Sequence, residues 1–474
     1  MGEGHDDAAE EQWRLFPDDV LAEVLRRAAP RGLAVSRCVC KAWRALVDGR
    51  RLLRADLLPR SLAGLLIEYR DQPYFFARPS VAAGDYHMHC DAFADHCNGL
   101  LLYYDGVLNP ATGGWTPLPE EEAPSMAGME HFPHEMYLAF DPALSSHYEV
   151  FVVPEVPVFY AGPRRPSPSS TSPCSSSSSE LCLSSEWPPS PLTLSVFSSR
   201  TGRRWDQRSF VREGDPAGTV ADMTLDERFM AQRNAVCWRG ALYVHCQTEF
   251  VLRISLSDDD NKYRVIKPPT DLTVSYCAEG YLGKSQKGVC LAVVQYHRLR
   301  VWILDDDESG GGQAKWILKH NSGDGLSMPS PINSSQAAAS GPWVLVDDDS
   351  DEPDKELQWN SDDDDDGESI ICTTTDEDKD GERRYVNIGI LGFHPYKEIV
   401  FLHRAWRRGL AYHMNSSKLE DLGNLRPKDD ASHADIRESY ILEYARSRIG
   451  RTFPYTPCLM GEFSGKLEDV LDDD

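Results

Sequence analysis

The sequence predicts an α+β multidomain chain, in which a small all-α module is followed by a large all-β, propeller-like domain with disordered inserts. Three observations support this prediction. Helical periodicity is confined to residues 15–60, short strand-like runs recur through residues 61–474, and two long segments of biased composition interrupt those runs. At roughly 100–200 residues per domain, the 474 residues hold one small module and one large repeat-built body. Residues 1–14 are expected to form a flexible tail.

Two amphipathic helical segments lie within residues 15–60. Pro17 and the two aspartates after it mark the start of the first helix, because proline suits the first turn and carboxylates there complement the helix dipole. Pro30 and Gly32 end this helix, and a second segment with three- and four-residue apolar spacing runs from Leu33 to Val47. A module of this size cannot build a robust core alone. We therefore expect it to complete its apolar surface on another protein.

The charge is distributed unevenly along the chain. The formal net charge is -26, and the stretch from Asp305 to Glu382 holds 23 acidic and 4 basic residues. Residues 11–60 are basic, with 11 basic and 6 acidic side chains. Because nucleic-acid binding draws its energy from basic groups that release condensed counterions, the overall acidity argues against nucleic acid as a partner.

Strand-like runs recur with a degenerate period after residue 60. They are rich in β-branched and aromatic residues and are broken by Gly, Pro, Asn and Asp. Several units pair an apolar run with a later stretch that ends in a turn and a tryptophan, as Val107–Trp115 and Val196–Trp205 do. A period of about 50 residues with several strands per unit is typical of a β-propeller, each unit being one blade. The apolar runs begin near residues 99, 148, 240, 288 and 398.

Two inserts are expected to be disordered. Residues 161–191 are rich in serine and proline, with 12 Ser or Pro among the 15 residues 166–180, and cannot bury enough apolar surface to offset the entropy of ordering. Residues 305–384 are strongly acidic and self-repelling, so most of this segment should be mobile. Short strands are expected inside it at Lys315–Leu318 and Trp343–Val346.

The N-terminal module resembles a known family. Residues 15–25 have the sequence Leu-Phe-Pro-Asp-Asp-Val-Leu-Ala-Glu-Val-Leu, and residues 36–44 have the sequence Ser-Arg-Cys-Val-Cys-Lys-Ala-Trp-Arg. These blocks resemble the F-box, the helical module by which substrate receptors dock on the Skp adaptor of cullin-based ubiquitin ligases. The following region is similar to the kelch-like β-propeller region of plant F-box proteins, through Cys-Asn-Gly-Leu-Leu-Leu-Tyr at 97–103 and Leu-Ala-Phe-Asp-Pro at 138–142.

The resemblance implies a non-catalytic substrate receptor of an SCF-type (Skp-cullin-F-box) E3 ubiquitin ligase. The F-box would dock on a Skp-type adaptor and through it on cullin, while the propeller would bind an unidentified target protein. No catalytic residue, cofactor or metal is expected. The arginines around the apolar residues favour an acidic partner, which the adaptor family is by resemblance. The residues expected to contact the adaptor are Phe16, Pro17, Val20, Leu21, Val24, Leu25, Leu33, Val39, Cys40 and Trp43.

Other interpretations of the same residues stay open at this point. The helical module could be a structural cap on a propeller enzyme, a scaffold acting outside a ligase, or a basic helix-turn-helix that reads DNA. A zinc site has enough ligands but no standard spacing, and the phosphate-loop resemblance of Gly283-Lys-Ser285 lacks the earlier glycine and a following helix. The residues with zinc-binding side chains are His87, His89, Cys90, His96 and Cys97.

Compartment and target contacts are weaker inferences. The 12 cysteines show no disulfide-framework spacing, and neither a secretory signal nor a membrane-spanning apolar run is evident, which predicts a cytoplasmic or nuclear protein with no membrane partner. The propeller loops converge on one face, where varied side chains can build a recognition surface. The candidates for target contact are Tyr160, Arg203, Arg204, His403, Trp406 and Arg407.

Overall fold

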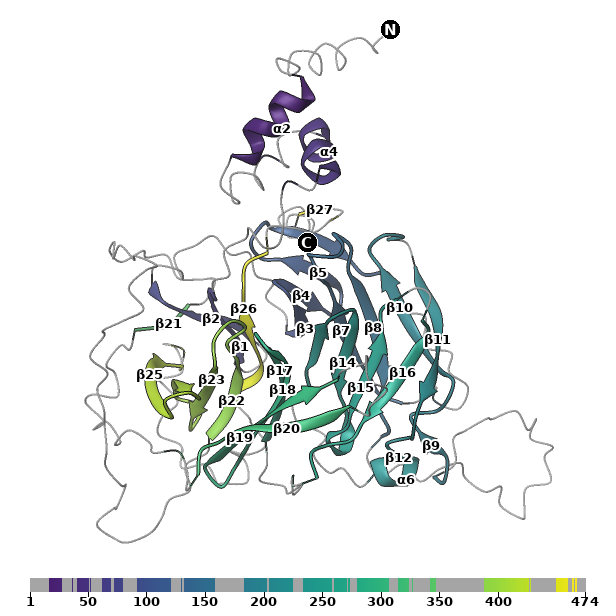
Figure 1. Ribbon diagram of the computed structural model, residues 1–474, viewed down its shortest axis with the longest axis vertical. Helices are drawn as coiled ribbons and strands as arrows, with labels where there is room; N and C mark the ends of the chain where they lie inside the picture. The colour runs from purple at the N-terminus through teal and green to yellow at the C-terminus, as the bar shows by residue number, and fades with distance from the viewer. Residues whose placement is uncertain are drawn as a thin grey trace, which may run out of the picture.

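The protein is mostly β, with few helices, and its strands have a propeller-like arrangement (Figure 1). The computed structural model describes the following residues: 17–27, 36, 41–50, 52, 62–69, 72–79, 92–120, 129, 132–157, 183–202, 204–224, 233–257, 260–270, 272, 279–306, 314–323, 326, 342–346, 388–425, 427, 449–458, 463 and 465–466. None of the helices in these ranges is long and apolar enough to cross a membrane.

Two helices lie in the N-terminal region, α2 (Asp18–Arg26) and α4 (Lys41–Gly49). Helix α2 begins after Pro17, whose carbonyl accepts hydrogen bonds from the backbone N–H groups of Val20 and Leu21. The first helix is therefore confirmed at the predicted start. Of the second predicted segment, Leu33–Val47, only Ser36 and residues 41–47 are described, and α4 continues two residues beyond it to Gly49.

The described strands include six units of four strands, called blades 1 to 6 here. Blade 1 contains β26 (Ile449–Tyr455), β1 (Gly64–Tyr69), β2 (Gln72–Ala77) and β21 (Val344–Val346), and blade 2 contains β3 (Phe93–Cys97), β4 (Leu100–Tyr103), β5 (Gly106–Asn109) and β6 (Gly114–Pro117), with β27 (Gly465–Lys466) added to its edge. Blade 3 contains β7 (His134–Ala139), β8 (Glu149–Pro154), β10 (Leu192–Ser198) and β11 (Trp205–Glu213), and blade 4 contains β13 (Ala235–Trp238), β14 (Ala241–His245), β15 (Val251–Ser255) and β16 (Lys262–Ile266). The outer strands of blades 3 and 4, β11 and β16, pair in parallel and join these two blades in one eight-stranded sheet. Blade 5 contains β17 (Glu279–Ser285), β18 (Gly288–Gln295), β19 (Arg298–Asp305) and β20 (Lys315–Asn321), and blade 6 contains β22 (Ile388–Phe393), β23 (Ile399–Arg404), β24 (Arg408–His413) and β25 (Lys418–Asn424).

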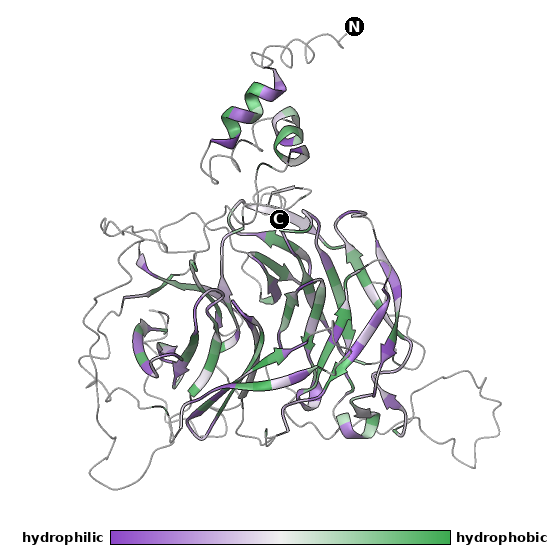
Figure 2. Ribbon diagram, viewed as in Figure 1, coloured by the Kyte–Doolittle hydropathy of each residue, from purple (hydrophilic) through white to green (hydrophobic). Residues whose placement is uncertain are grey.

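The blades are arranged in a closed ring. The first strands of successive blades contact one another in the order β26, β3, β7, β13, β17, β22 and back to β26. Antiparallel pairing within each blade buries an apolar face against the next blade, and Figure 2 shows hydrophobic residues concentrated along these strands. The small elements β9 (Glu186–Trp187), β12 (Gly218–Thr219), α6 (Val220–Met223) and η2 (Gln247–Glu249) lie in connections between strands. The propeller prediction is confirmed, and the blade number, which the sequence left open, is six in the described residues.

Distant segments of the chain close blade 1. Strand β26, from the C-terminal region, pairs with β1 so that Tyr455 lies opposite Gly64. The outer strand β21 comes from the acidic segment between blades 5 and 6 and pairs with β2. Blade 1 therefore combines strands from distant parts of the chain, and this closes the ring. No blade is left with an unpaired inner strand.

The two ends of the ring differ in their connections. The ends of β3, β7, β13 and β17 gather at one end, which we call the hairpin face, where short turns such as Asn98–Gly99 and Arg239–Gly240 lie. The chain enters β1 at this face, since Gly64 pairs with the end of β26. The long connections leave from the opposite end, the loop face, where the described strands before them end: β6, β8, β11, β16, β20 and β25. In Figure 1, α2 and α4 lie beyond the hairpin face, and α6 lies at the loop face.

Both predicted inserts contain ordered structure. The predicted end of the disordered Ser/Pro-rich insert, residue 191, lies too late in the chain. Residues 183–191 are described and include β9, and Trp187 is buried in the core of blades 3 and 4. Trp343 anchors the acidic segment by packing on Phe76 and Phe401, and the two strands expected inside that segment are confirmed as β20 and β21. Residues 158–182, 307–313, 324–325, 327–341 and 347–387 lie outside the described residues.

Candidate adaptor-binding surface and loop face

Helix α2 has a buried side and an exposed apolar side. Ala22 and Leu25 pack with Val47 of α4 and with Leu52 in a small core that Leu21, Trp43 and Leu46 partly cover. This buried side explains why the segment folds as a helix, because alanine and leucine recur there at a spacing of three to four residues.

The exposed apolar side of α2 is formed by Pro17, Val20 and Val24. The exposed fractions are 45% for Val20 and 58% for Val24, and Pro17 is also exposed. These positions follow one another at steps of three and four residues, so they share one face of the helix. Arg27 continues the same face one turn later and is exposed. We call Pro17, Val20, Val24 and Arg27 the α2 surface.

Ion pairs around the α2 surface are exposed and weak. Arg26 and Arg27 both contact Glu23, and Arg50 lies 2.5 Å from Asp19. Pairs this exposed contribute at most about 1 kcal/mol each, because water and salt screen them. The arginines of this region therefore stay available to an acidic partner at little energetic cost.

Comparison with known families assigns this region. The family described as F-box domain matches residues 13–55, which include α2 and α4. The chain carries an F-box domain. An Arabidopsis thaliana protein that bears the name of an F-box protein is 21% identical to this chain over 339 residues, covering 65% of this chain and 74% of that protein. A match of that length extends beyond the F-box into the propeller-like region.

The solved structures that match are distant. Kluyvelomyces marxianus Hsv2 covers 54% of this chain and 65% of its own, with a TM-score of 0.24 and 10% identity. A chain from a study of two prolyl endopeptidases covers 88% of this chain and 56% of its own, with a TM-score of 0.25 and 9% identity. Similarities this low say nothing about the activity of the present chain.

The ten residues predicted to contact an adaptor fall into four groups. Pro17, Val20 and Val24 are exposed, whereas Leu21 and Trp43 are half-buried at the edge of the small F-box core. Leu25 is buried in that core, where it holds α2 on α4, and its contact with an adaptor stays a prediction. The remaining predicted residues lie outside the described part of the chain: Phe16, Leu33, Val39 and Cys40.

The residues suggested for target contact are also separated. Arg204 is exposed and pairs with Asp206, but it follows the turn between β10 and β11 at the hairpin face. His403 is buried and Trp406 stacks on it, so His403 is a packing residue, and burial lowers the pKa of its imidazole to about 3. Arg407 is exposed in the β23–β24 turn at the loop face. Tyr160 and Arg203 lie outside the described residues.

Sequence reasoning missed two exposed aromatic residues at the loop face. Tyr104 follows β4, and Tyr296 lies in the tight turn between β18 and β19 with a φ of 49°. Both side chains are largely exposed. A usable signal was present, because Tyr104 is the last residue of one predicted apolar run and Tyr296 lies two residues after another, where a turn had to follow.

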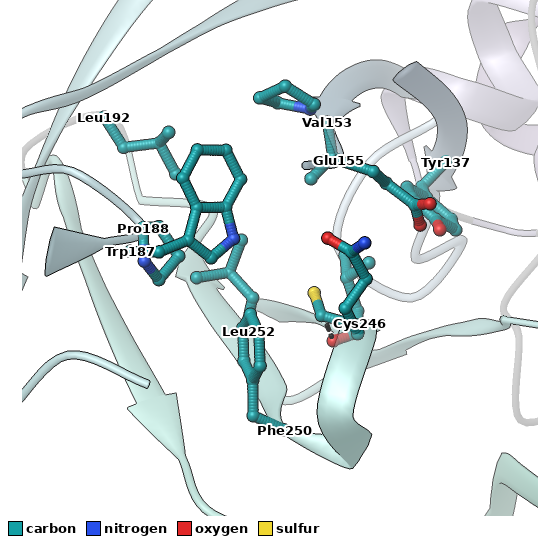
Figure 3. A pocket seen from close by; sticks show the side chains of 12 residues that line it. Tyr137, Val153, Glu155, Trp187, Pro188, Leu192, Cys246, Phe250 and Leu252 are labelled. Carbon is teal, nitrogen blue, oxygen red and sulfur yellow. Dashed lines mark hydrogen bonds between the residues drawn. The ribbon is translucent and has the colours of Figure 1, made fainter. Parts of the chain in front are cut away.

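A small hollow opens between blades 3 and 4 at the loop face (Figure 3). Trp187 and Phe250 form its aromatic walls, and the polar groups along it already have partners within the chain. Arg233 contacts both carboxylate oxygens of Glu155, at 3.1 and 2.9 Å, and the Gln247 amide bonds the backbone of Val156 at 2.9 and 2.7 Å. The hollow is thus an apolar depression with a fixed polar rim and shows no arrangement of catalytic groups.

The zinc candidates do not form a site in the described residues. His96 stacks on Phe453 with ring centroids 4.2 Å apart, and burial lowers the pKa of its imidazole to about 3. Cys97 donates a hydrogen bond to the Phe140 carbonyl at 3.2 Å. No group of three or more metal-binding side chains occurs among the residues whose placement is described, and His87, His89 and Cys90 are not among them.

Proposed function

We propose that this chain is the substrate-recognition subunit of an SCF-type E3 ubiquitin ligase. The F-box match to residues 13–55 carries this proposal, and the exposed apolar side of α2 beside basic residues supports it. On this proposal the F-box, as a separate helical module at residues 15–60, docks on a Skp-type adaptor and through it on cullin. The chain itself is not an enzyme; it holds a target near the ubiquitin carrier and so raises the effective concentration of the acceptor lysine. The complex acts in the cytoplasm, the nucleus or both.

The α2 surface supplies the apolar contact for the adaptor. Fully burying a valine side chain is worth about 1.5–3 kcal/mol, so covering the exposed halves of Val20 and Val24 contributes about 1 kcal/mol each. Aspartate at both positions removes this gain and places two charges against a dry interface. A loss of about 2 kcal/mol already weakens binding about thirtyfold.

The propeller-like domain, residues 61–474, binds the target protein through its loop face. Two observations support this assignment. The long connections leave the ring at the loop face, where variable segments can differ without disturbing the strands. The chain arrives from the F-box at the opposite face, because β1 begins there and only residues 50–63 separate α4 from β1. The adaptor and the target then occupy opposite ends of the ring.

Adaptor binding is tested with purified full-length chain, a Skp-type adaptor and cullin. Wild type is compared with the double variant Val20→Asp, Val24→Asp, and with Val211→Asp as the matched control, since Val211 is 57% exposed on the outer strand of blade 3. We expect wild type and control to bind equally and the double variant to bind at least about thirtyfold more weakly with unchanged circular dichroism. Wild type that fails to bind any Skp-type adaptor would refute the proposal.

Target binding is tested by capture from cell extract with the proteasome inhibited. The loop-face double variant Tyr296→Ala, Arg407→Glu is compared with Arg204→Glu at the hairpin face. We expect the loop-face variant alone to lose the captured proteins while adaptor binding stays intact. Loss with Arg204→Glu and not with the loop-face variant would place the target site at the other face.

A further inference from the structure

Exposed lysines gather at the hairpin face of blades 5 and 6. Lys287 lies in the turn between β17 and β18, and Lys397 lies in the turn between β22 and β23. Lys418 begins β25, directly after the turn between β24 and β25. All three side chains are exposed. We call Lys287, Lys397 and Lys418 the basic patch.

Backbone pairing holds the turns of the basic patch side by side. His413 at the end of β24 pairs with Ile399 of β23 on one side and with Lys418 of β25 on the other. Lys397 lies two residues before Ile399 in the chain. Because neighbouring strands lie about 5 Å apart, the turns that carry Lys397 and Lys418 are about 10 Å from each other. Lys287 joins them through blade 6, since its Nζ atom lies 3.6 Å from the carboxylate of Glu398, the residue after Lys397.

The carboxylates at this end do not neutralise the basic patch. Glu398 is shared between Lys287 and Lys319, and Lys287 remains 63% exposed. Glu420 lies 3.1 Å from the ring of His413. Four lysines thus face two carboxylates, a local net charge of +2 among these groups, in a chain whose formal net charge is -26. The lysines of this group are Lys287, Lys319, Lys397 and Lys418.

The F-box is tethered next to the basic patch. Leu52 packs in the small F-box core, and Leu62 packs on the apolar core between blades 1 and 6. The ten residue steps between them span at most about 35 Å even when fully extended. Arg78 extends the positive charge to this entry point, because it directly follows Ala77, which pairs with Gly64 at the start of β1. The F-box region itself is basic, with 11 basic and 6 acidic side chains in residues 11–60. A protein docked on the F-box therefore lies close to a second basic surface.

We propose that the basic patch is a second contact site for the protein that docks on the F-box, and that it binds an acidic segment of that protein. The proposal rests on the proposed function, because it starts from an adaptor on the α2 surface. Charge complementarity selects an acidic occupant, and the large exposed apolar side chains of the described residues all lie outside these turns. The strongly negative net charge of the chain disfavours nucleic acid. Exposed charges at the rim of an interface act mainly on the association rate and are screened by salt.

The test measures binding of a Skp-type adaptor to the full-length chain at two salt concentrations, about 50 mM and about 500 mM, between which the screening length falls from roughly 14 Å to roughly 4 Å. The patch variant Lys397→Glu, Lys418→Glu is compared with the loop-face variant Arg298→Glu, Arg407→Glu. The two variants change the net charge equally but at opposite ends of the ring, and all four side chains are exposed.

We expect the loop-face variant to bind the adaptor as wild type does at both salt concentrations. The patch variant should bind about tenfold more weakly at low salt, chiefly through slower association, and within about twofold of wild type at high salt. The neutral variant Lys397→Gln, Lys418→Gln should show a smaller loss at low salt, because it removes the attraction without adding repulsion. A loss in both patch variants that salt does not change would come from misfolded turns and would overturn the proposal.

Failure of this inference and failure of the proposed function give different results. If wild type binds no Skp-type adaptor, the proposed function fails and this inference fails with it. If wild type binds and the patch variant binds like the loop-face variant, the second contact is overturned while docking through the α2 surface stands. Loss of captured target proteins with unchanged adaptor binding in the patch variant would assign the patch to the target and would also overturn the proposal.

Discussion

Replacing Asp95 by asparagine should make the stability of the propeller less dependent on pH. Asp95 lies in β3, is 1% exposed, and accepts the backbone N–H of Leu138 in β7 at 2.8 Å. Burial raises the pKa of its carboxyl group from 3.8 to about 7, although hydrogen bonds to Leu138 and His96 and the charge of Arg451 act in the opposite direction. Asparagine keeps an acceptor oxygen for Leu138 and cannot ionise.

The sign and size of this pH effect on folding stability follow from the number of protons that Asp95 binds in the folded and in the unfolded state. Because the folded-state pKa is above the unfolded value, the folded state holds this proton between about pH 4 and 7 while the unfolded state has lost it. Folded stability therefore falls as the pH rises through this window. Each pH unit corresponds to about 1.4 kcal/mol, and the folded-state carboxyl is half ionised at pH 7, so wild type should lose about 2 kcal/mol between pH 5 and pH 7 from this group and only about 0.4 kcal/mol above that.

The assay is urea unfolding of full-length wild type and Asp95→Asn at pH 5, 6, 7 and 8, followed by tryptophan fluorescence. Other groups titrate in both proteins, so the difference between the two stability curves isolates Asp95. We expect the stability of the variant relative to wild type to rise by about 2 kcal/mol from pH 5 to pH 7 and by only about 0.4 kcal/mol more by pH 8. Parallel curves would show that Asp95 is ionised in the folded protein throughout, and the reasoning from burial would be wrong.

Three further outcomes follow from packing and ring closure. Leu25→Ala should destabilise the F-box by about 2–5 kcal/mol, because Leu25 fills the small core, while the exposed Val24→Ala should change it by less than about 0.5 kcal/mol; hydrogen exchange over residues 17–27 measures both. Gly99→Ala should lower the unfolding temperature more than Gly240→Ala, since both have positive φ but a Cβ at 99 would lie 2.4 Å from the Thr456 carbonyl oxygen and one at 240 meets nothing within 4 Å; equal shifts would exclude the clash. A chain ending at residue 448 lacks β26 and should lose the cooperative unfolding transition in calorimetry, whereas a chain ending at 466 should keep it.

The repeat could be predicted from the sequence because its most regular elements are local hairpins. All five predicted apolar runs are second strands of their blades: β4, β8, β14, β18 and β23. Three of these strands follow a turn that contains a glycine with positive φ, at Gly99, Gly240 and Gly288. A backbone conformation that few other residues tolerate thus marks the start of the strand in the sequence.

Ring closure could not be predicted, because it joins segments far apart in the sequence. Strand β26 pairs with β1 although nearly the whole propeller lies between them, and β21 crosses from the acidic segment to blade 1. The acidic composition around Trp343 indicates disorder, but the tryptophan itself packs between Phe76 and Phe401. Local composition cannot show that one aromatic residue in a polar segment finds a distant apolar site.

The candidate docking residues were only partly predictable for a geometric reason. The sequence shows one apolar stripe on the first helix. The stripe alone does not show which of its residues pack against the rest of the F-box and which stay exposed. The position of α4 decides this, since Leu25 faces Val47 while Val20 and Val24 face away. The distinction matters for mutagenesis, because changing Leu21 or Trp43 removes core contacts together with any contact to a partner.

The difference between the two ends of the ring also bears on the proposed function. At the hairpin face, short turns interlock: Lys284 of blade 5 bonds Asn98 of blade 2, Cys97 bonds the Phe140 carbonyl, and the backbone after β26 lies against Gly99. These contacts tie the blades together where the chain arrives from the F-box. Under the proposed function, ubiquitin transfer by proximity requires the target to be held at a defined distance from the adaptor, and a stiff ring between the two proposed binding faces would meet that requirement.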